Sequence, residues 1–309
     1  MKILFTGLSS FTGAWFAREL ADAGHAVVAP LRSSVDRYDA GRARRIGFAG
    51  SAVRLIENAP FGSDAFRKII RDDGPFDLLC HHAADVTNYR SADFDVQAAL
   101  ANNTHGLAAV LKELQIKNSR VGMIATGSVF EQNEGAGDFP LRAFSPYGLS
   151  KGLSWQITDF YCSSLHIPLS KFVIPNPFGP YEELRFTAYL LRTWKEGKVA
   201  AVKTPDYVRD NIHVDLLAKT YVRLVEKTIT PENSGGRLAP SGYIESQGSF
   251  ALRVAQMMQT RLGLECRVDL QIQQEFAEPM IRVNTDSAKM LVKNWSEAGA
   301  WDAMAEFYR

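Results

Sequence analysis

The sequence predicts an α/β protein: a doubly wound parallel sheet of the Rossmann type, with a smaller C-terminal substrate domain. Short apolar runs alternate with helical patterns in the first half of the chain, which is typical of a parallel sheet covered by helices on both faces. The chain also opens with an apolar strand that runs directly into a small-residue turn and a helix. We expect strands at residues 2–7, 26–31, 53–56, 77–83, 121–126 and 169–175.

The turn after the first expected strand has the composition of a dinucleotide-binding loop. Gly7 would make the tight turn, and Gly13 would let the next helix, expected from about Phe11 to Ala23, pack closely against the strand. Ser10 replaces the usual central glycine, so its side chain would either crowd a pyrophosphate or donate a hydrogen bond to it. An ordinary strand-turn-helix is the alternative. The expected cofactor contacts are Gly7, Ser9, Ser10, Phe11, Thr12 and Gly13.

Three further residues place a hydroxyl, a phenol and an ammonium where hydride transfer needs them. Tyr147 and Lys151 are four residues apart and share one face of a helix. A tyrosine with its ordinary pKa near 10 is a weak base at neutral pH, and a nearby ammonium would stabilise its phenolate. Thr126 lies about 20 residues earlier, at the end of an apolar strand. The alternative is that Tyr147 is only a packed helix aromatic.

These motifs together resemble the extended short-chain dehydrogenase/reductase family, specifically its nucleotide-sugar epimerases, dehydratases and ketoreductases. Further pieces occur in the family's order, and the resemblance covers nearly the whole chain. They are His82-Ala83-Ala84 after an apolar strand, Asn103 in a helix, Asn176-Pro-Phe-Gly-Pro180, and the segment from Arg209 to Asp215.

The resemblance implies a role for each matching residue. Tyr147 would be the acid/base, Lys151 would hold the cofactor, and Thr126 would bond the substrate oxygen, with Ser128 nearby as a second candidate. Asn103 would steady the lysine, although the neighbouring Asn102 is an alternative. His82, Ala83 and Ala84 would contact the cofactor.

The regular alternation ends after Asn176. We therefore expect a dinucleotide-binding domain over residues 1–175 and a mainly substrate-binding domain over 176–309. Segments near 208–222 and 237–240 are expected to return to the Rossmann sheet.

The end of the second strand bears on cofactor choice. An NAD-preferring site usually places an acid there to bond the ribose hydroxyls, whereas this chain has Leu31. Arg32 and Ser33 offer donors to a 2′-phosphate instead. This favours NADP, with NAD as the other candidate, because Asp36 could reach the ribose and Arg32 could be a solvated surface residue.

Two residues of the second half match the family's phosphate ligands. Asn176 corresponds to an asparagine that meets a nucleotide diphosphate, and Arg209 to an arginine that pairs with the same phosphates. A nucleotide-diphosphate sugar is the substrate that this implies. A turn at Asn176 and a local ion pair of Arg209 with Asp210 are the structural alternatives.

The reaction type depends on the two residues directly after Thr126. Dehydratases of this family carry Asp-Glu there, but this chain has Gly127 and Ser128, and Glu131 could take that place only with a shifted loop. Dehydration is therefore disfavoured. We expect C4 ketoreduction of a nucleotide-linked sugar. A C4 epimerase with tightly bound NAD is the first alternative, and a non-catalytic dinucleotide sensor is a second of another class.

Composition agrees with an ordinary protein of the cytoplasm. Hydrophobic residues make up 46% and charged residues 22%, and the formal net charge of +1 gives no electrostatic reason to bind nucleic acid. No apolar run is long enough to span a membrane, and the six histidines and three cysteines show no metal-ligand spacing. We also expect a homodimer through two helices with apolar surface to spare, unless these side chains all face the core. They are Leu149, Leu153, Ile157, Leu100, Leu107 and Leu111.

Overall fold

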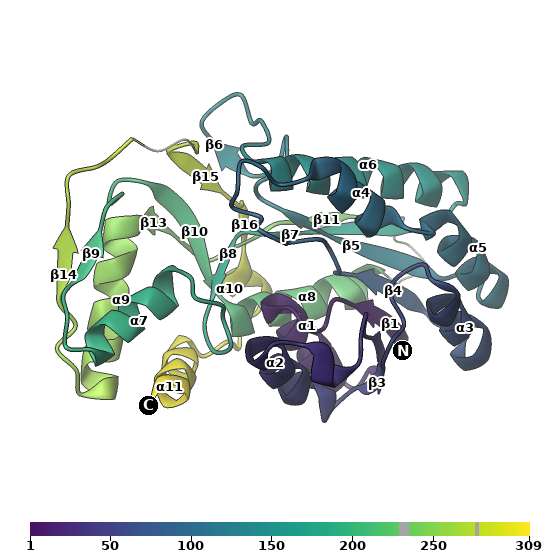
Figure 1. The fold of residues 1–309 in the computed structure, drawn as a ribbon, viewed down its shortest axis with the longest axis horizontal. Coiled ribbons are helices and arrows are strands. Elements are labelled where there is room, and N and C mark those ends of the chain that lie inside the picture. Colours follow the sequence, from purple (N-terminus) through teal and green to yellow (C-terminus); the bar gives the residue numbers. More distant parts are fainter. Residues whose placement is uncertain (229–234, 276–277) are drawn as a thin grey trace. The chain divides into compact units, whose positions relative to one another are not determined.

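The computed structural model describes residues 1–228, 235–275 and 278–309 and divides into two units (Figure 1). The first unit consists of Met1–Glu134, Arg142–Ile174 and Ala218–Leu238. The second consists of Gly135–Leu141, Pro175–Leu217 and Ala239–Arg309. The chain thus leaves the first unit and returns to it.

A seven-stranded sheet forms the centre of the first unit, with the strand order β11-β7-β5-β4-β1-β2-β3. Every pairing along this sheet is parallel. The strands are β1 (Lys2–Thr6), β2 (Ala26–Pro30), β3 (Arg54–Ile56), β4 (Leu78–His81), β5 (Gly122–Ser128), β7 (Leu169–Ile174) and β11 (Arg237–Leu238). The predicted doubly wound parallel sheet is confirmed.

Helices cover both faces of this sheet (Figure 1). On one face lie α1 (Phe11–Asp22), α2 (Ala40–Gly50) and α8 (Val214–Thr228), the last of which begins in the second unit. On the other face lie α3 (Asp64–Asp73), α4 (Val96–Thr104), α5 (Leu107–Lys117) and α6 (Pro146–Ser164). A short 3-10 helix, η1, spans Val35–Arg37. Side-chain caps explain where several of these helices begin, since Ser10, Asp39, Ser63, Asp95 and Ser145 each accept a hydrogen bond from an amide in the first turn.

Apolar side chains fill the space on each face. Phe66, Phe76, Leu79 and Met123 belong to the cluster under α3 and α5. On the other face, Tyr221 of α8 stacks on Phe16 of α1 with ring centroids 4.4 Å apart. Continuous apolar strands suit a sheet that is buried on both sides.

Of the six apolar side chains expected at a dimer contact, only some are exposed. Leu107 and Leu111 are 2% and 1% exposed and belong to the core cluster, so they are not free for a partner. Leu100, Leu153 and Ile157 are half-buried, whereas Leu149 is exposed. The apolar surplus therefore lies on α6.

A five-stranded sheet organises the second unit, with the order β13-β10-β15-β6 and with β8 also paired to β10. Two short two-stranded sheets pair β12 with β16 and β14 with β9. The strands are β6 (Ala136–Gly137), β8 (Asn176–Phe178), β9 (Ala200–Val202), β10 (Val208–His213), β12 (Pro240–Ser241), β13 (Tyr243–Ser246), β14 (Val268–Leu270), β15 (Ile281–Val283) and β16 (Asp286–Ser287). The helices are α7 (Phe186–Lys195), α9 (Gln247–Leu262), α10 (Ala288–Leu291) and α11 (Glu297–Tyr308). Trp194, Phe250 and Trp301 lie in the core of this unit.

The return of the chain to the main sheet differs from the expectation. Residues 237–238 do return, as β11 beside β7, but the strand near 208–214 stays in the second unit as β10. The buried Asp210 explains this, because its carboxylate accepts hydrogen bonds from the amides of Gly242 (2.7 Å) and Asn284 (3.1 Å) in the neighbouring chain segments. Residues 135–141 also belong to the second unit rather than to the first.

Candidate active site

The turn between β1 and α1 is built for close backbone approach. Gly7 has a φ of +87°, and a Cβ atom on it would lie 2.7 Å from the Ala83 nitrogen. A Cβ on Gly13 would lie 2.1 Å from the Gly7 carbonyl oxygen. Glycine is therefore required at both positions, as the sequence predicts.

Ser10 serves the turn itself. Its hydroxyl donates to the Gly7 carbonyl at 2.9 Å and accepts from the Gly13 amide at 3.1 Å, which caps α1. The hydroxyl also lies 3.2 Å from the His82 ring Nε2, so the side chain points back into the loop, and its contact with a pyrophosphate stays a prediction. The amides of Phe11 and Thr12 have no partner within the helix and sit at its positive end. The turn, with the half-buried Ser9, thus fits a dinucleotide pyrophosphate.

The end of β2 has no carboxylate at the expected ribose position. Leu31 is 2% exposed, its amide donates to Ile56 and its carbonyl accepts from Ala59. The Arg32 side chain is exposed and Ser33 is half-buried beside it. Leu31 therefore packs inward, whereas Arg32 and the alternative Asp36 are both exposed.

His82, at the end of β4, connects the glycine turn to β5. Its ring Nδ1 lies 3.0 Å from the Thr126 hydroxyl oxygen, and its Nε2 lies 3.1 Å from that of Thr12. The amides of His82 and Ala83 both donate to the Thr6 hydroxyl, and Ala84 follows as a half-buried residue. Burial lowers the pKa of His82 to about 3, so the ring is neutral at physiological pH.

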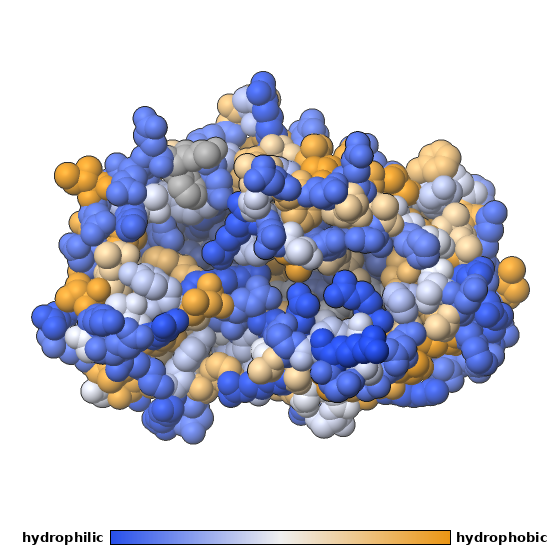
Figure 2. Space-filling model, in the orientation of Figure 1, coloured by the Kyte–Doolittle hydropathy of each residue, from blue (hydrophilic) through white to orange (hydrophobic). Residues whose placement is uncertain are grey.

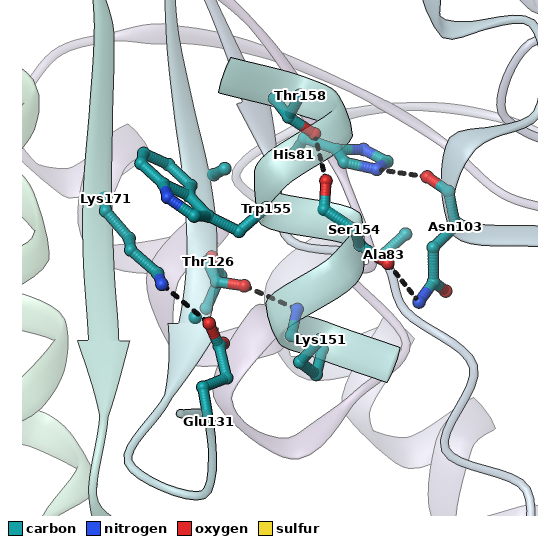
Figure 3. A pocket seen from close by; sticks show the side chains of 12 residues that line it. His81, Ala83, Asn103, Thr126, Glu131, Lys151, Ser154, Trp155, Thr158 and Lys171 are labelled. Atoms are coloured by element: carbon teal, nitrogen blue, oxygen red, sulfur yellow. Dashed lines mark hydrogen bonds and ion pairs between the residues drawn. The ribbon is translucent and has the colours of Figure 1, made fainter. Parts of the chain in front are cut away.

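Thr126 and Lys151 meet in a small pocket of the first unit (Figure 3). Thr126 lies near the end of β5 and is 7% exposed, and Lys151 is 8% exposed on α6. The Lys151 ammonium donates to the Thr126 carbonyl oxygen. Burial lowers the pKa of Lys151, and the nearby Glu131 carboxylate opposes that effect.

Tyr147 stands one helical turn before Lys151, among aromatic rings. The rings of Tyr89, Phe94 and Phe130 each meet it edge-on, at centroid distances of 5.6, 6.0 and 6.3 Å. A ring packed from several sides keeps few rotamers. Tyr147 and Lys151 are four residues apart on α6 and so share one face of the helix, but Tyr147 is not among the residues that line the pocket of Thr126 and Lys151.

Asn103 rather than Asn102 lies at the pocket. It is 6% exposed, its amide nitrogen donates to the Ser154 hydroxyl at 3.1 Å, and its side-chain oxygen accepts from the Asp85 amide. Asn102 is exposed and bonds the Asp85 carboxylate. The alignment that the sequence left open by one residue therefore favours Asn103.

Ser128 ends β5 two residues after Thr126, and Glu131 follows just beyond the strand. The Ser128 amide donates to a Glu131 carboxylate oxygen at 2.7 Å, and its hydroxyl accepts from the Phe130 amide. Glu131 is ion-paired with Lys171 at 2.6 Å. An acid held in this way is not placed as a replacement for the Asp-Glu pair of dehydratases.

The two predicted phosphate ligands lie on neighbouring strands of the second unit. Asn176 is half-buried on β8, which pairs with β10 through Asn211. Arg209 of β10 is 3% exposed, stacks on the Tyr207 ring and forms an ion pair with Glu278 at 2.9 Å. Asp210, the alternative partner of Arg209, accepts from the backbone amides of Gly242 and Asn284. A phosphate that bound Arg209 would compete with Glu278.

Sequence reasoning missed three features of these regions. The ring of His82 lies within hydrogen-bond distance of the hydroxyls of Ser10, Thr12 and Thr126. Lys171 pairs with Glu131, and Glu278 pairs with Arg209. Each depends on residues far apart in the chain, and a lysine in the apolar strand β7 was the one visible indication. The described residues contain no cluster of histidine, cysteine or acidic side chains able to hold a metal ion. In the part of the chain described, no helix is both long and apolar enough to cross a membrane.

The fold and the motifs around Thr126, Tyr147 and Lys151 define an extended short-chain dehydrogenase/reductase. Residues 3–234 match the NAD dependent epimerase/dehydratase family, and the chain belongs to this family of enzymes. A comparison with curated proteins gave no match.

Solved structures of nucleotide-sugar epimerases share the fold. UDP-glucuronic acid 4-epimerase from Bacillus cereus, in complex with UDP-glucuronic acid and NAD, is 19% identical, with 100% of this chain and 99% of that chain covered and a TM-score of 0.72. UDP-glucose 4-epimerase from Bifidobacterium longum, in complex with NAD+ and UDP, is 19% identical, with 100% and 97% covered and a TM-score of 0.70. UDP-N-acetylglucosamine 4-epimerase from Methanobrevibacter ruminantium is 15% identical, with 99% and 97% covered and a TM-score of 0.72.

Proposed function

We propose that this protein is an NAD(P)-dependent oxidoreductase that acts at C4 of a nucleotide-linked sugar, with Tyr147 as the acid/base. The observation that carries the proposal is that Tyr147 and Lys151 lie one helical turn apart on α6, with the Lys151 ammonium hydrogen-bonded to the Thr126 carbonyl oxygen near the end of β5. Family membership supports the redox chemistry, and the UDP-sugar ligands of similar proteins support the substrate class.

The chain's own residues would move the proton. A bound nicotinamide supplies or accepts the hydride. The Tyr147 hydroxyl gives its proton to the sugar oxygen when a ketone is reduced and takes it back when an alcohol is oxidised. The Lys151 ammonium stabilises the phenolate that forms in between. Thr126, whose hydroxyl oxygen lies 3.0 Å from the His82 ring, would hydrogen-bond the same sugar oxygen.

Ketoreduction is our first candidate, because Leu31 and Arg32 favour NADP(H), and a ketoreductase consumes NADPH as its hydride donor. C4 epimerisation is the second candidate. It is favoured by the similar structures, which are 4-epimerases, and by the NAD that two of them contain.

One experiment separates the two candidates. The purified protein is denatured, and the nucleotide that it releases is identified by mass spectrometry. The native protein is then incubated with UDP-sugars and their 4-keto forms. Retained NAD with interconversion of C4 epimers and no net cofactor use indicates an epimerase. Stoichiometric NADPH oxidation with a keto sugar indicates a reductase. Neither activity over a broad sugar-nucleotide panel, with clear dinucleotide binding, would favour the sensor hypothesis.

A further inference from the structure

A carboxylate faces the proposed catalytic lysine from inside the protein. The pocket that Lys151 lines has a volume of about 20 Å³, which is room for roughly one water molecule. Figure 3 shows Glu131 and Lys171 in this same pocket, with Trp155 beside Lys171. Among the described residues that line the pocket, Glu131 is the one carboxylate.

Glu131 is fixed from two sides. One oxygen accepts from the Ser128 amide at 2.7 Å, and the other accepts from the Lys171 ammonium at 2.6 Å. Its side chain is 1% exposed, and that of Lys171 is 6% exposed. Lys171 also pairs with Glu134 at 2.7 Å, and Glu134 in turn binds Arg237. The carboxylate of Glu131 therefore has little freedom to turn away from the pocket.

The absence of a side chain at Gly127 leaves room for the ion pair of Glu131 and Lys171. A Cβ atom on Gly127 would lie 2.6 Å from the Lys171 Cε and 3.0 Å from a Glu131 oxygen. Folding stability alone does not explain the ion pair, because the cost of removing both charges from water offsets most of their attraction. Apolar residues at such positions often give a protein of equal stability. A role in the chemistry of the pocket does explain it.

The charges around Lys151 indicate what the role of Glu131 is. Burial opposes its ammonium form and lowers its pKa, Glu131 raises it, and Lys171 lowers it. His81 and His82 also face Lys151 from β4, but burial lowers their pKa values to about 4 and about 3, so both are neutral at physiological pH. Asn103 of α4 also lines the pocket, but its side chain carries no charge. The carboxylate of Glu131 is thus the charged group that offsets the cost of burying this ammonium, together with the Thr126 carbonyl oxygen that accepts its hydrogen bond.

We propose that Glu131, held in place by Lys171, is a positioning residue that keeps Lys151 in its ammonium form beside Tyr147. The proposal deepens the proposed function and rests on it, since the ammonium matters only if Lys151 assists Tyr147. The electrostatic claim itself concerns only the protein and can be tested without substrate or cofactor.

The test measures the pKa of Lys151 directly in four proteins: the wild type, Glu131→Gln, Lys171→Met and the double variant. Lysine-selective carbon-13 NMR follows each Cε signal with pH, and Lys151→Arg identifies the signal. Glu131→Gln should lower the pKa of Lys151 by about one pH unit, because a carboxylate is lost while Lys171 stays charged. Lys171→Met should raise it, and the double variant should lie near the wild type. Glu113→Gln, a carboxylate that pairs with Arg67 and Arg71, is the matched control and should change nothing.

Shifts of the Lys151 pKa in opposite directions in the two single variants indicate an electrostatic effect. A merely structural change would shift the Lys151 pKa in the same direction in both variants. Circular dichroism and thermal melting establish that each variant is folded. If Lys171→Met does not fold, Glu131→Gln should still give a lower Lys151 pKa than the double variant. An unchanged pKa in Glu131→Gln, or shifts of the same sign in both single variants, would overturn the proposal. If the shifts occur as expected but no sugar nucleotide is ever turned over, the proposed function fails and the electrostatic role stands.

Discussion

The ring nitrogen Nδ1 of His82 lies 3.0 Å from the hydroxyl oxygen of Thr126. The same ring reaches Thr12 with its other nitrogen, and so a neutral buried imidazole joins the proposed cofactor turn to the proposed catalytic strand. Whichever nitrogen carries the proton, a charged ring would have to be buried at this junction. The protein therefore has a built-in sensitivity to acid.

His82→Leu should weaken the pH dependence of stability. The folded-state pKa of about 3 lies below the value near 6.5 of the unfolded chain, so the unfolded state binds the proton first as the pH falls. Between pH 6.5 and pH 5, His82 should lower the unfolding free energy of the wild type by about 2 kcal/mol. The variant lacks the imidazole and should not show this decrease. At pH 7 the variant should be less stable by about 1–3 kcal/mol, because its hydroxyl partners are left without the ring. Urea unfolding at pH 7, 6 and 5 measures both effects.

Other buried titratable groups also make the unfolding free energy depend on pH, but the wild type and His82→Leu share them. His81 and His213 act in the same direction, each with a pKa lowered to about 4 by burial. Glu182 and Asp210 act in the opposite direction, because burial raises their pKa values to about 8 and about 6. His105→Leu, at an exposed position, is the control. Parallel pH curves for His82→Leu and the wild type would contradict the assignment.

Tyr147→Phe should abolish turnover while dinucleotide and sugar-nucleotide binding remain nearly unchanged, since it removes one transferable proton. General acid/base contributions are on the order of 10² to 10⁴ in rate. Single-turnover kinetics and binding titrations separate the two effects. Tyr161→Phe, on the same helix, should keep its activity. A near-normal rate in Tyr147→Phe would mean that the proton comes from Thr126, Ser128 or water.

Arg209→Ala and Glu278→Gln should change the affinity for uridine diphosphate in opposite directions. The first removes a guanidinium that can bind phosphate, and the second removes the carboxylate that competes for it. We expect about tenfold weaker binding for Arg209→Ala and several-fold tighter binding for Glu278→Gln, measured by calorimetry. Glu245→Gln, whose carboxylate pairs with Arg253, is the control. Equal affinities in all four proteins would exclude Arg209 as a phosphate ligand.

NADPH should raise the melting temperature more than NADH does, and Arg32→Ala should reduce the difference. Ligand-linked stabilisation grows with affinity, so that a tenfold difference is worth roughly 1.4 kcal/mol. Arg18→Ala, which removes an ion pair with Asp22 on α1, is the control. A larger shift with NADH would instead support the NAD that similar epimerases contain.

A homodimer should form through α6, and Leu149→Asp or Phe160→Asp should dissociate it. These side chains are 43% and 65% exposed. On the face that Figure 2 shows, apolar residues are scattered among hydrophilic ones, and some of them lie over α6. Sedimentation at micromolar concentration measures the association. Leu252→Asp, at an exposed site on α9, should leave the dimer intact, and a wild-type protein that is only monomeric would refute the prediction.

The sequence predicted the main sheet almost strand by strand because apolar runs and glycine turns are local features. It placed Gly7 and Gly13 correctly for the same reason, since the need for glycine arises within one turn. It could not predict that β10 stays in the second unit, which depends on the amide partners of Asp210 dozens of residues away. The role of Ser10 remained open because a serine in this loop could either crowd a pyrophosphate or donate to it, and its capping of α1 was not predicted.

The path of the chain through the main sheet has a consequence for biosynthesis. β11 lies beside β7, and Tyr221 of α8 fills the space between Phe16 and Phe172, so the first unit becomes complete only when residues up to 238 have been made. Until then, one edge of the nascent sheet has unpaired backbone groups and an apolar face is uncovered. A truncated chain ending near residue 175 should therefore be prone to aggregate, because it lacks both β11 and α8.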